Sequence, residues 1–352
     1  MPRNRVLVVD DSALMRKMIA DMINSHDEFE VVGKAGNGQE ALEKIKELQP
    51  DLVVMDMEMP VLDGLSTLRR IMESQPLPVI MFSGLNSKET EQTLKALQLG
   101  AVDFILKPSG QISLDIGNIK EEFIEKLKVA ANSNRKLQLY QSPPAPALKT
   151  KKSLPDEGGR LNKLVVIAAS TGGPKALHQV IPRFPAGIDA AVLVVQHMPP
   201  GFTGTLAERL DSLSELKVKE AERGEKVLPG CVYIAPGDYH LKAQSRLKGA
   251  ENELYIELDQ SKPRGGLRPA ADIMLKSVTE QFWSHIVCVI LTGMGNDGSA
   301  ALPLIKEKKG KIIAEHQSTC VVYGMPKAAI ETGLVDKIVP LSEITEEVLS
   351  ML

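Results

Sequence analysis

Short apolar runs alternate with amphipathic segments along the first part of the chain. The runs are rich in Val, Ile and Leu and lie at residues 5–9, 29–35, 51–55, 77–82 and 101–106. Segments such as 13–26 and 38–49 lie between them, with apolar residues at helical spacing. Near-continuous apolar strands separated by helices are typical of a parallel sheet covered on both faces. The pattern therefore predicts a doubly wound α/β domain, closed by a last helix near 116–135.

A change of composition marks the end of this domain. Residues 136–160 are rich in Pro, Lys and Gly, have nothing to bury, and are expected to form a linker. Strand–helix alternation then restarts, with apolar runs at 163–170, 190–197, 286–292 and 310–316. Between about 217 and 260 the polar–apolar alternation predicts β-hairpins inserted into the second domain. We therefore expect two domains, 1–135 and 161–352, both doubly wound and of the α/β class.

Bulk composition narrows the function classes. A chain of 352 residues is long for one core, which agrees with two domains. Its net charge of −3 gives no indication of a nucleic-acid-binding surface. The three cysteines lie far apart, which fits neither a disulfide framework nor a zinc cluster and indicates a reducing compartment. No apolar run approaches the ~18 residues of a membrane span, and the start of the chain is unlike a signal peptide. We expect a cytoplasmic protein without membrane insertion.

Polar side chains stand where the predicted strands of the first domain end. Asp10 and Asp11 follow the first strand, Asp56 the third, Ser83 the fourth and Lys107 the fifth. These strand ends meet at one sheet edge, where open α/β sheets bind ligands. Three carboxylates there repel one another unless a cation joins them, and such an oxygen-rich set suits Mg²⁺. Asp56 could then attack phosphorus, with Lys107 and Ser83 holding the phosphoryl oxygens. Helix capping explains any single Asp, but not the whole set.

These residues lie in motifs that resemble the receiver domain of two-component response regulators. The motifs are VLVVDDS, VVMDMEMPVLDG, MFSG and FILKPS, within about residues 4–130. The resemblance implies a flavodoxin-like sheet, Asp56 as phospho-acceptor and a histidine kinase as phosphodonor. It further implies Mg²⁺ at Asp10, Asp11 and Asp56, and a switch formed by Ser83, Phe104 and Lys107.

The second domain offers a serine nucleophile and partners for it. Ser170 ends an apolar run in a turn of small residues, and a serine hydroxyl needs a base in reach and donors for the oxyanion. His197 ends another run, and Asp297 lies in the loop LTGMGNDG after a third, so the three could form a triad. His316 and His240 are alternative bases, and the G-x-S-x-G nucleophile elbow is not matched.

The same loop allows a different interpretation. GMGNDG has the G-x-G-x-x-G form of a dinucleotide-binding turn, and Glu315 follows the next strand, about where a ribose-binding acid would lie. A nucleotide-dependent oxidoreductase is therefore one alternative function. Against it, Asp297 would place its charge where the pyrophosphate approaches the helix N-terminus. A phospho-switch that only binds a partner is the other alternative.

The second domain as a whole resembles the catalytic domain of the chemotaxis protein-glutamate methylesterase family. The motifs that carry the resemblance are IAASTGGPKAL, VVQHMPPGFT, YIAPGDYH, RPAADIM, LTGMGNDG and CVVYGMPKAAI. The resemblance implies Ser170 as nucleophile, His197 as its base and Asp297 as the residue that orients His197. Backbone N–H groups of Thr171 and Met294 are the implied oxyanion donors.

The reaction that this resemblance implies is hydrolysis of glutamate methyl esters on methyl-accepting chemoreceptors, with release of methanol. It also implies deamidation of receptor glutamines by the same route. The phosphodonor would be the chemotaxis histidine kinase, and phosphorylation would control the hydrolase. No cofactor is expected in the esterase site.

Overall fold

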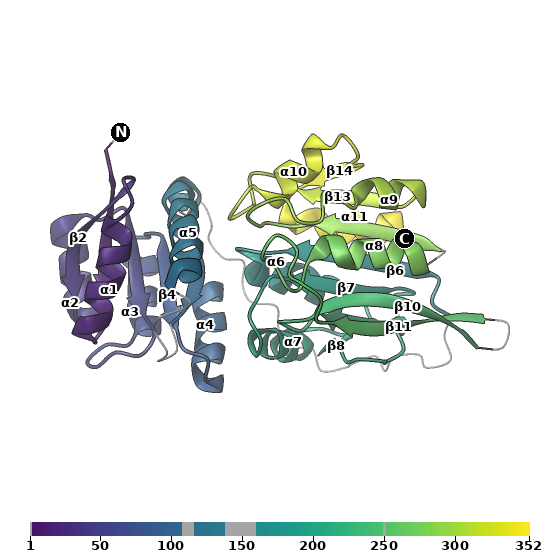
Figure 1. Ribbon diagram of the computed structural model, residues 1–352, viewed down its shortest axis with the longest axis horizontal. Coiled ribbons are helices and arrows are strands. Elements are labelled where there is room, and N and C mark those ends of the chain that lie inside the picture. Colours follow the sequence, from purple (N-terminus) through teal and green to yellow (C-terminus); the bar gives the residue numbers. More distant parts are fainter. Residues whose placement is uncertain (1, 108–115, 138–159, 249–250, 283) are drawn as a thin grey trace. The chain divides into compact units, whose positions relative to one another are not determined.

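The computed structural model describes residues 2–107, 116–137, 160–248, 251–282 and 284–352. The chain forms two compact units, Met1–Pro143 and Pro144–Leu352, which are described separately (Figure 1). None of the helices in the described part of the chain has the length and apolar character that a membrane crossing needs. Most of the expected linker, residues 138–159, lies outside the described residues, so the boundaries 1–135, 136–160 and 161–352 stay predictions.

The first unit is built on a five-stranded parallel sheet with the order β2-β1-β3-β4-β5. The strands are β1 (Asn4–Val9), β2 (Phe29–Ala35), β3 (Leu52–Asp56), β4 (Val79–Ser83) and β5 (Asp103–Leu106). The helices are α1 (Ala13–Asn24), α2 (Gly38–Leu48), α3 (Gly64–Ser74), α4 (Ser87–Leu99) and α5 (Ile116–Leu137). β3 and β4 are buried along their whole length, which explains why their sequences are apolar runs rather than alternating patterns.

Local sequence explains where the helices of this unit begin. A side-chain oxygen before each of α1 to α4 accepts a hydrogen bond from a backbone N–H of the first turn, which would otherwise lack a partner. The capping residues are Ser12, Asn37, Asp63 and Asn86. At its other end, α4 stops at Gly100, whose φ of 119° strains glycine least.

The second unit contains a seven-stranded parallel sheet with the order β14-β13-β12-β6-β7-β9-β8, and a separate antiparallel hairpin, β10-β11. The strands are β6 (Lys163–Ala169), β7 (Ala191–Gln196), β8 (Lys217–Glu220), β9 (Cys231–Ile234), β10 (His240–Lys248), β11 (Glu251–Asp259), β12 (His285–Ile290), β13 (Lys311–Glu315) and β14 (Lys337–Val339). The helices are α6 (Gly173–Val180), α7 (Phe202–Leu213), α8 (Ala271–Gln281), α9 (Leu302–Glu307), α10 (Met325–Glu331) and α11 (Ile344–Met351), with short 3₁₀ turns η1 (Ile181–Arg183) and η2 (Leu341–Glu343).

The expectation of several hairpins between 217 and 260 is wrong in part. β8 and β9 pair in parallel with each other, and β9 pairs in parallel with β7, so both belong to the main sheet. β8 lies at the sheet edge, where one face meets solvent, and its alternating pattern cannot be told from that of a hairpin strand. Among the described residues of this region, only β10 and β11 pair as antiparallel neighbours, and they pack against α8 through a bond from the Ala243 N–H to the Ser277 hydroxyl (Figure 1).

The strand order of the second unit determines where its candidate functional residues meet. β6 is flanked by β12 and β7, and all three run parallel. Ser170 follows β6, His197 follows β7, and the loop with Asp297 follows β12. The α/β fold class predicted for both units is confirmed.

Candidate functional site

A tight turn after β6 presents Ser170. The Gly173 N–H donates to the Ser170 carbonyl at 2.7 Å, and the Ser170 N–H donates to the Thr292 carbonyl at 3.0 Å, which ties the turn to the end of β12. Gly172 has a φ of +80°, and a Cβ built on it would lie 2.6 Å from the Cβ of Val321. This position therefore requires glycine both for its conformation and for space.

His197 and Asp297 form a buried pair at the same sheet edge. His197 Nε2 lies 2.8 Å from Asp297 Oδ2, and each side chain is only 7% exposed. The carboxylate accepts a hydrogen bond from Nε2–H, which leaves the other ring nitrogen, Nδ1, unprotonated in the neutral imidazole. Nδ1 is buried and has no hydrogen-bond partner among the described residues, so its bond with Ser170 is not made in this structure.

The N-terminus of α8 holds Asp297 in place. Its carboxylate accepts the backbone N–H of Ala271 at 2.5 Å and that of Asp272 at 3.0 Å. Burial raises the pKa of Asp297, but the hydrogen bond and charge of His197 together with these two N–H groups outweigh burial and lower the pKa below its ordinary value of 3.8. Asp297 is therefore charged at neutral pH, oriented, and available to stabilise a protonated His197.

The two expected oxyanion donors lie on loops that meet at Ser170. Thr171 directly follows the serine, and its carbonyl accepts the Thr292 hydroxyl at 3.0 Å. A Cβ built on Gly293 would lie 2.8 Å from the Ser170 Cβ, so the backbone just before Met294 runs against the serine. The structure thus brings the loops of Thr171 and Met294 to the same place, and their role as oxyanion donors stays a prediction.

The alternative bases contact other groups. His240 is fully buried, where its Nδ1 accepts the Ala270 N–H at 3.2 Å. His316 Nδ1 lies 2.8 Å from the Ser318 hydroxyl. His197 is the histidine that the structure pairs with a buried carboxylate.

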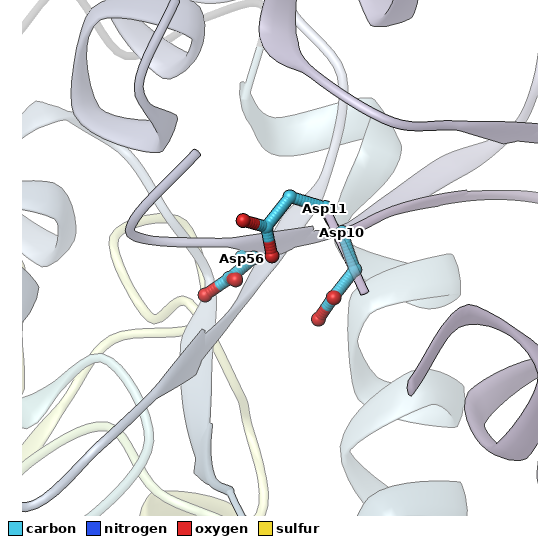
Figure 2. Close-up of side chains that lie close together, drawn as sticks. All are labelled: Asp10, Asp11 and Asp56. Atoms are coloured by element: carbon cyan, nitrogen blue, oxygen red, sulfur yellow. The ribbon is translucent and has the colours of Figure 1, made fainter. Parts of the chain in front are cut away.

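The first unit brings three acidic residues together at the carboxyl edge of its sheet. One carboxylate oxygen from each of Asp10, Asp11 and Asp56 lies within 4.8 Å of the other two. Figure 2 shows these three side chains close together. Asp10 Oδ2 is buried without a hydrogen-bond partner among the described residues. Burial, helped by the charge of Asp56, raises the pKa of Asp10 to about 6, although the Ser12 N–H opposes the shift. An unpaired anionic oxygen in a cluster of hard oxygen donors fits a divalent cation.

Lys107 supplies the positive charge of this cluster. Its Nζ lies 2.5 Å from Asp56 Oδ1, and the Asp56 side chain is 1% exposed. Burial still raises the pKa of Asp56, against the lowering effect of Lys107. The Ser83 hydroxyl instead accepts the Thr93 hydroxyl at 2.6 Å and donates to the Gly84 carbonyl at 3.1 Å.

The other expected switch residue, Phe104, is held inside the first unit. Phe104 is 4% exposed, and its ring lies under Lys126 of α5, whose Nζ is 5.3 Å from the ring centroid. Lys126 also donates to the Phe104 carbonyl at 2.7 Å. Phe104 is therefore packed inward, with a cation over its ring.

Comparison with known proteins decides the family. Residues 165–348, more than half of the chain, match the family described as CheB methylesterase, and residues 6–115 match the response regulator receiver domain. The chain belongs to the CheB methylesterase family. It is 85% identical over 352 residues, the whole of both chains, to a protein-glutamate methylesterase/protein-glutamine glutaminase of Syntrophomonas wolfei. It is also 48% identical to a protein of the same name from Pyrococcus abyssi, over 98% of this chain and 92% of that one.

A solved CheB structure agrees with the fold of the second unit. The catalytic domain of Thermotoga maritima CheB methylesterase is 48% identical, with a TM-score of 0.52, and the match covers 54% of this chain and 99% of that one. Family membership confirms the resemblance read from the motifs, and with it the hydrolase class. The roles of individual residues stay predictions.

The dinucleotide interpretation of the GMGNDG loop does not fit the structure. Glu315 is fully buried and accepts the Thr292 N–H at 2.8 Å, so its carboxylate is not open to a ribose. Asp297 faces His197 and the first turn of α8. The loop of this CheB chain is therefore arranged around its carboxylate rather than around a phosphate.

Two side chains at the site were not found from the sequence. Thr292 ties the Ser170–Thr171 turn to a neighbouring loop, because its hydroxyl donates to the Thr171 carbonyl and lies 3.0 Å from the Val322 N, which donates to it. Gln196 is fully buried at the end of β7 and bonds to the main chain around Ser170. A large polar residue that ends an otherwise apolar strand, as in AVLVVQ, was the available signal for Gln196.

Proposed function

We propose that the chain hydrolyses glutamate methyl esters on methyl-accepting chemoreceptors and deamidates receptor glutamines, under control of phosphorylation at Asp56. Its relatives carry the name of both activities, protein-glutamate methylesterase/protein-glutamine glutaminase. The mechanism rests on one observation above all: the 2.8 Å contact of His197 with Asp297, at the sheet edge that also carries Ser170.

The direction of proton transfer follows from that contact. Asp297 accepts a hydrogen bond from the Nε2–H of His197, so the unprotonated Nδ1 is the base. In the reaction Nδ1 takes the hydroxyl proton of Ser170 while Oγ forms a bond to the ester carbonyl carbon. The imidazolium that results is stabilised by the charged carboxylate of Asp297.

Two acyl-transfer steps then complete the cycle. The tetrahedral intermediate collapses, the bond to the methoxy oxygen breaks, and His197 Nδ1 gives its proton to the leaving group, which departs as methanol. Water attacks the acyl-enzyme, Nδ1 accepts its proton and returns it to Ser170, and glutamate is released. With a glutamine substrate the leaving group is ammonia. No cofactor enters these steps.

Backbone donors stabilise the oxyanion in this proposal. The N–H groups of Thr171 and Met294 lie on the two loops that converge on Ser170. The serine also precedes α6, whose N-terminus favours negative charge on the carbonyl oxygen. Fixed donors of this kind are effective because they need no reorientation as charge develops.

The proposal assigns phosphoryl acceptance to Asp56, with a chemotaxis histidine kinase as donor. Asp10, Asp11 and Asp56 would hold Mg²⁺, which supplies positive charge to the phosphoryl oxygens when bound. Lys107, already 2.5 Å from Asp56, would pair with the phosphoryl group. The reaction would take place in the cytoplasm, where the three buried cysteines stay reduced.

In this proposal, the response of the receiver to phosphorylation requires the Ser83 hydroxyl to change its hydrogen-bond partners. Its hydroxyl is engaged with Thr93 and Gly84, and a phosphoryl group on Asp56 would compete for it. The face that carries Phe104, held by Lys126, would reorder in response.

Methanol release from membranes with labelled, methylated receptors tests the reaction. Ser170→Ala should lower the rate by roughly a thousandfold or more, while a small phosphodonor still phosphorylates Asp56. Ser318→Ala, in the same unit, is the matched control and should leave the rate unchanged. Methanol release by Ser170→Ala at the wild-type rate would show that another group is the nucleophile.

A further inference from the structure

We propose that Gln196 is a positioning residue that sets the spacing between the nucleophile and its base, and that Gly173 is glycine in order to leave room for it. This inference rests on the proposed roles of Ser170 and His197. It concerns a side chain that touches neither the substrate nor the reacting atoms.

The amide group of Gln196 joins the main chains of the two catalytic residues. Its Nε2 donates to the Ser170 carbonyl at 3.0 Å and to the His197 carbonyl at 3.1 Å. An amide NH₂ has two hydrogens, so both donors are used on these two carbonyls. A flipped amide would place its oxygen against two carbonyl oxygens, so the contacts determine the orientation.

These bonds lie beyond the regular strand pairing. The β6–β7 ladder ends at the pair Ala169–Gln196, and the His197 N–H donates to the Ala169 carbonyl at 3.1 Å. The strands are therefore already joined without the Gln196 side chain. Its amide acts only on the segments that follow the strands, where Ser170 and His197 stand.

The oxygen of the Gln196 amide, Oε1, is buried and has no hydrogen-bond partner in the described part of the chain, which packing alone does not explain. Such an oxygen destabilises the folded state, and an apolar side chain of similar size would avoid the penalty. A glutamine at this position is consistent with a requirement for its two donors.

Gly173 makes room for this oxygen. A Cβ built on Gly173 would lie 1.9 Å from Gln196 Oε1 and 2.8 Å from the Ala169 Cβ. The φ of Gly173 is outside the left-handed region, unlike the +80° of Gly172, so space and not conformation requires glycine here. The two adjacent positions of the turn therefore require glycine for different reasons: Gly172 for conformation and space, Gly173 for space alone.

The spacing matters because the catalytic hydrogen bond is still to be made. His197 Nδ1 has no partner among the described residues, and the bond with Ser170 must form when substrate is bound. A displacement of about 1 Å in such a pair can lower the rate about 100-fold. Gln196 limits this displacement because it holds the main chain of both residues.

The test replaces the donors while keeping the size of the side chain. Gln196→Met has similar length and no donors; Gln281→Met, at the far end of α8 from Asp297, is the matched control. A serine-directed fluorophosphonate counts the competent sites: Ser170 Oγ bonds to phosphorus, fluoride leaves, and His197 takes the proton. We expect Gln196→Met to lower kcat per labelled site about 10- to 100-fold, with KM within about twofold. Gln281→Met should behave as wild type.

A merely structural role would give a different result. It would reduce the labelled fraction or the melting temperature and leave kcat per labelled site unchanged, which would overturn the inference. Ser170→Ala is assayed alongside. If Ser170→Ala keeps its activity, the proposed function fails; if it is inactive and Gln196→Met is normal per site, only the positioning role fails.

Gly173 is tested by a double-mutant cycle. Gly173→Ala should lower the rate of fluorophosphonate labelling in the wild-type background, and it should do so less in a Gln196→Ala background, where the oxygen is gone. Relief is expected to be incomplete because the Ala169 Cβ remains. Equal effects in both backgrounds would contradict the role assigned to this glycine.

Discussion

Replacement of Asp297 by asparagine tests how the carboxylate acts on His197. Oδ2 of Asp297 accepts from His197 Nε2 and from the Ala271 N–H, and Oδ1 accepts from the Asp272 N–H. Asparagine keeps one acceptor oxygen and replaces the other with an NH₂ donor. Whichever way the amide is oriented, at least one of the three contacts is therefore lost.

The two possible orientations of the asparagine amide give a lower and an upper value for the expected fall in rate. With the oxygen in place of Oδ2, His197 keeps its tautomer and loses only the charge that stabilises its protonated form. Hydrogen bonds to charged groups contribute up to about 3 kcal/mol, or about 100-fold in rate. With the NH₂ group in place of Oδ2, it donates to Nε2 and the ring proton moves to Nδ1, where it blocks the base. In serine proteases the corresponding change lowers kcat about 10,000-fold.

The assay is methanol release at saturating substrate, with the fold checked by circular dichroism. We expect kcat to fall about 100-fold or more and KM to change little, because Asp297 does not contact the substrate in the proposed mechanism. Asp336→Asn is the matched control: its carboxylate also accepts a backbone N–H, that of Ile312 at 2.8 Å, but belongs to a different part of the sheet. A folded Asp297→Asn protein with kcat within about threefold of wild type would refute the reasoning.

Three further outcomes are expected. We expect the unphosphorylated receiver to inhibit the hydrolase, so a fragment of residues 161–352 should release methanol faster than the unphosphorylated full chain and should not respond to a phosphodonor; a fragment no faster than the unphosphorylated full chain would contradict this inhibition. Ser83→Ala should accept phosphate at Asp56, measured by acid-labile label, but show reduced activation, because the hydroxyl that exchanges partners is absent; full activation would exclude that exchange. The folded-state pKa of Asp297 lies below 3.8, so its carboxylate stabilises the fold above about pH 4, and this contribution is lost as the pH falls through the folded-state value. The difference in unfolding free energy between wild-type and Asp297→Asn fragments should therefore shrink below about pH 4, and a difference that grows there would contradict the lowered pKa.

Much of the site could be predicted because parallel strands bring their carboxyl ends together. Asp10, Asp56, Ser170 and His197 each follow a buried apolar run, and that position alone places them at a sheet edge. The sequence pattern predicted the wrong pairing for β8. Polar–apolar alternation indicates one exposed face of a strand, but it does not show whether the neighbouring strand runs parallel or antiparallel.

Contacts between distant segments could not be predicted. The loop of Asp297 was visible as a glycine-rich sequence, but its anchor is the start of α8, 25 and 26 residues earlier in the chain. Likewise, nothing in the motif STGGP shows that a side chain at the first glycine would collide with Val321 and one at the second glycine with Gln196. Such contacts depend on how helices and loops pack on the sheet, which a local pattern does not record.

The most direct test of phosphorylation-controlled ester hydrolysis is the initial rate of methanol release by the full chain, before and after addition of a small phosphodonor with Mg²⁺. The account predicts a higher rate after addition for the wild type, no change for Asp56→Asn, and background rates throughout for Ser170→Ala. A wild-type chain that releases no methanol in either condition, or an Asp56→Asn chain that responds as the wild type does, would contradict it.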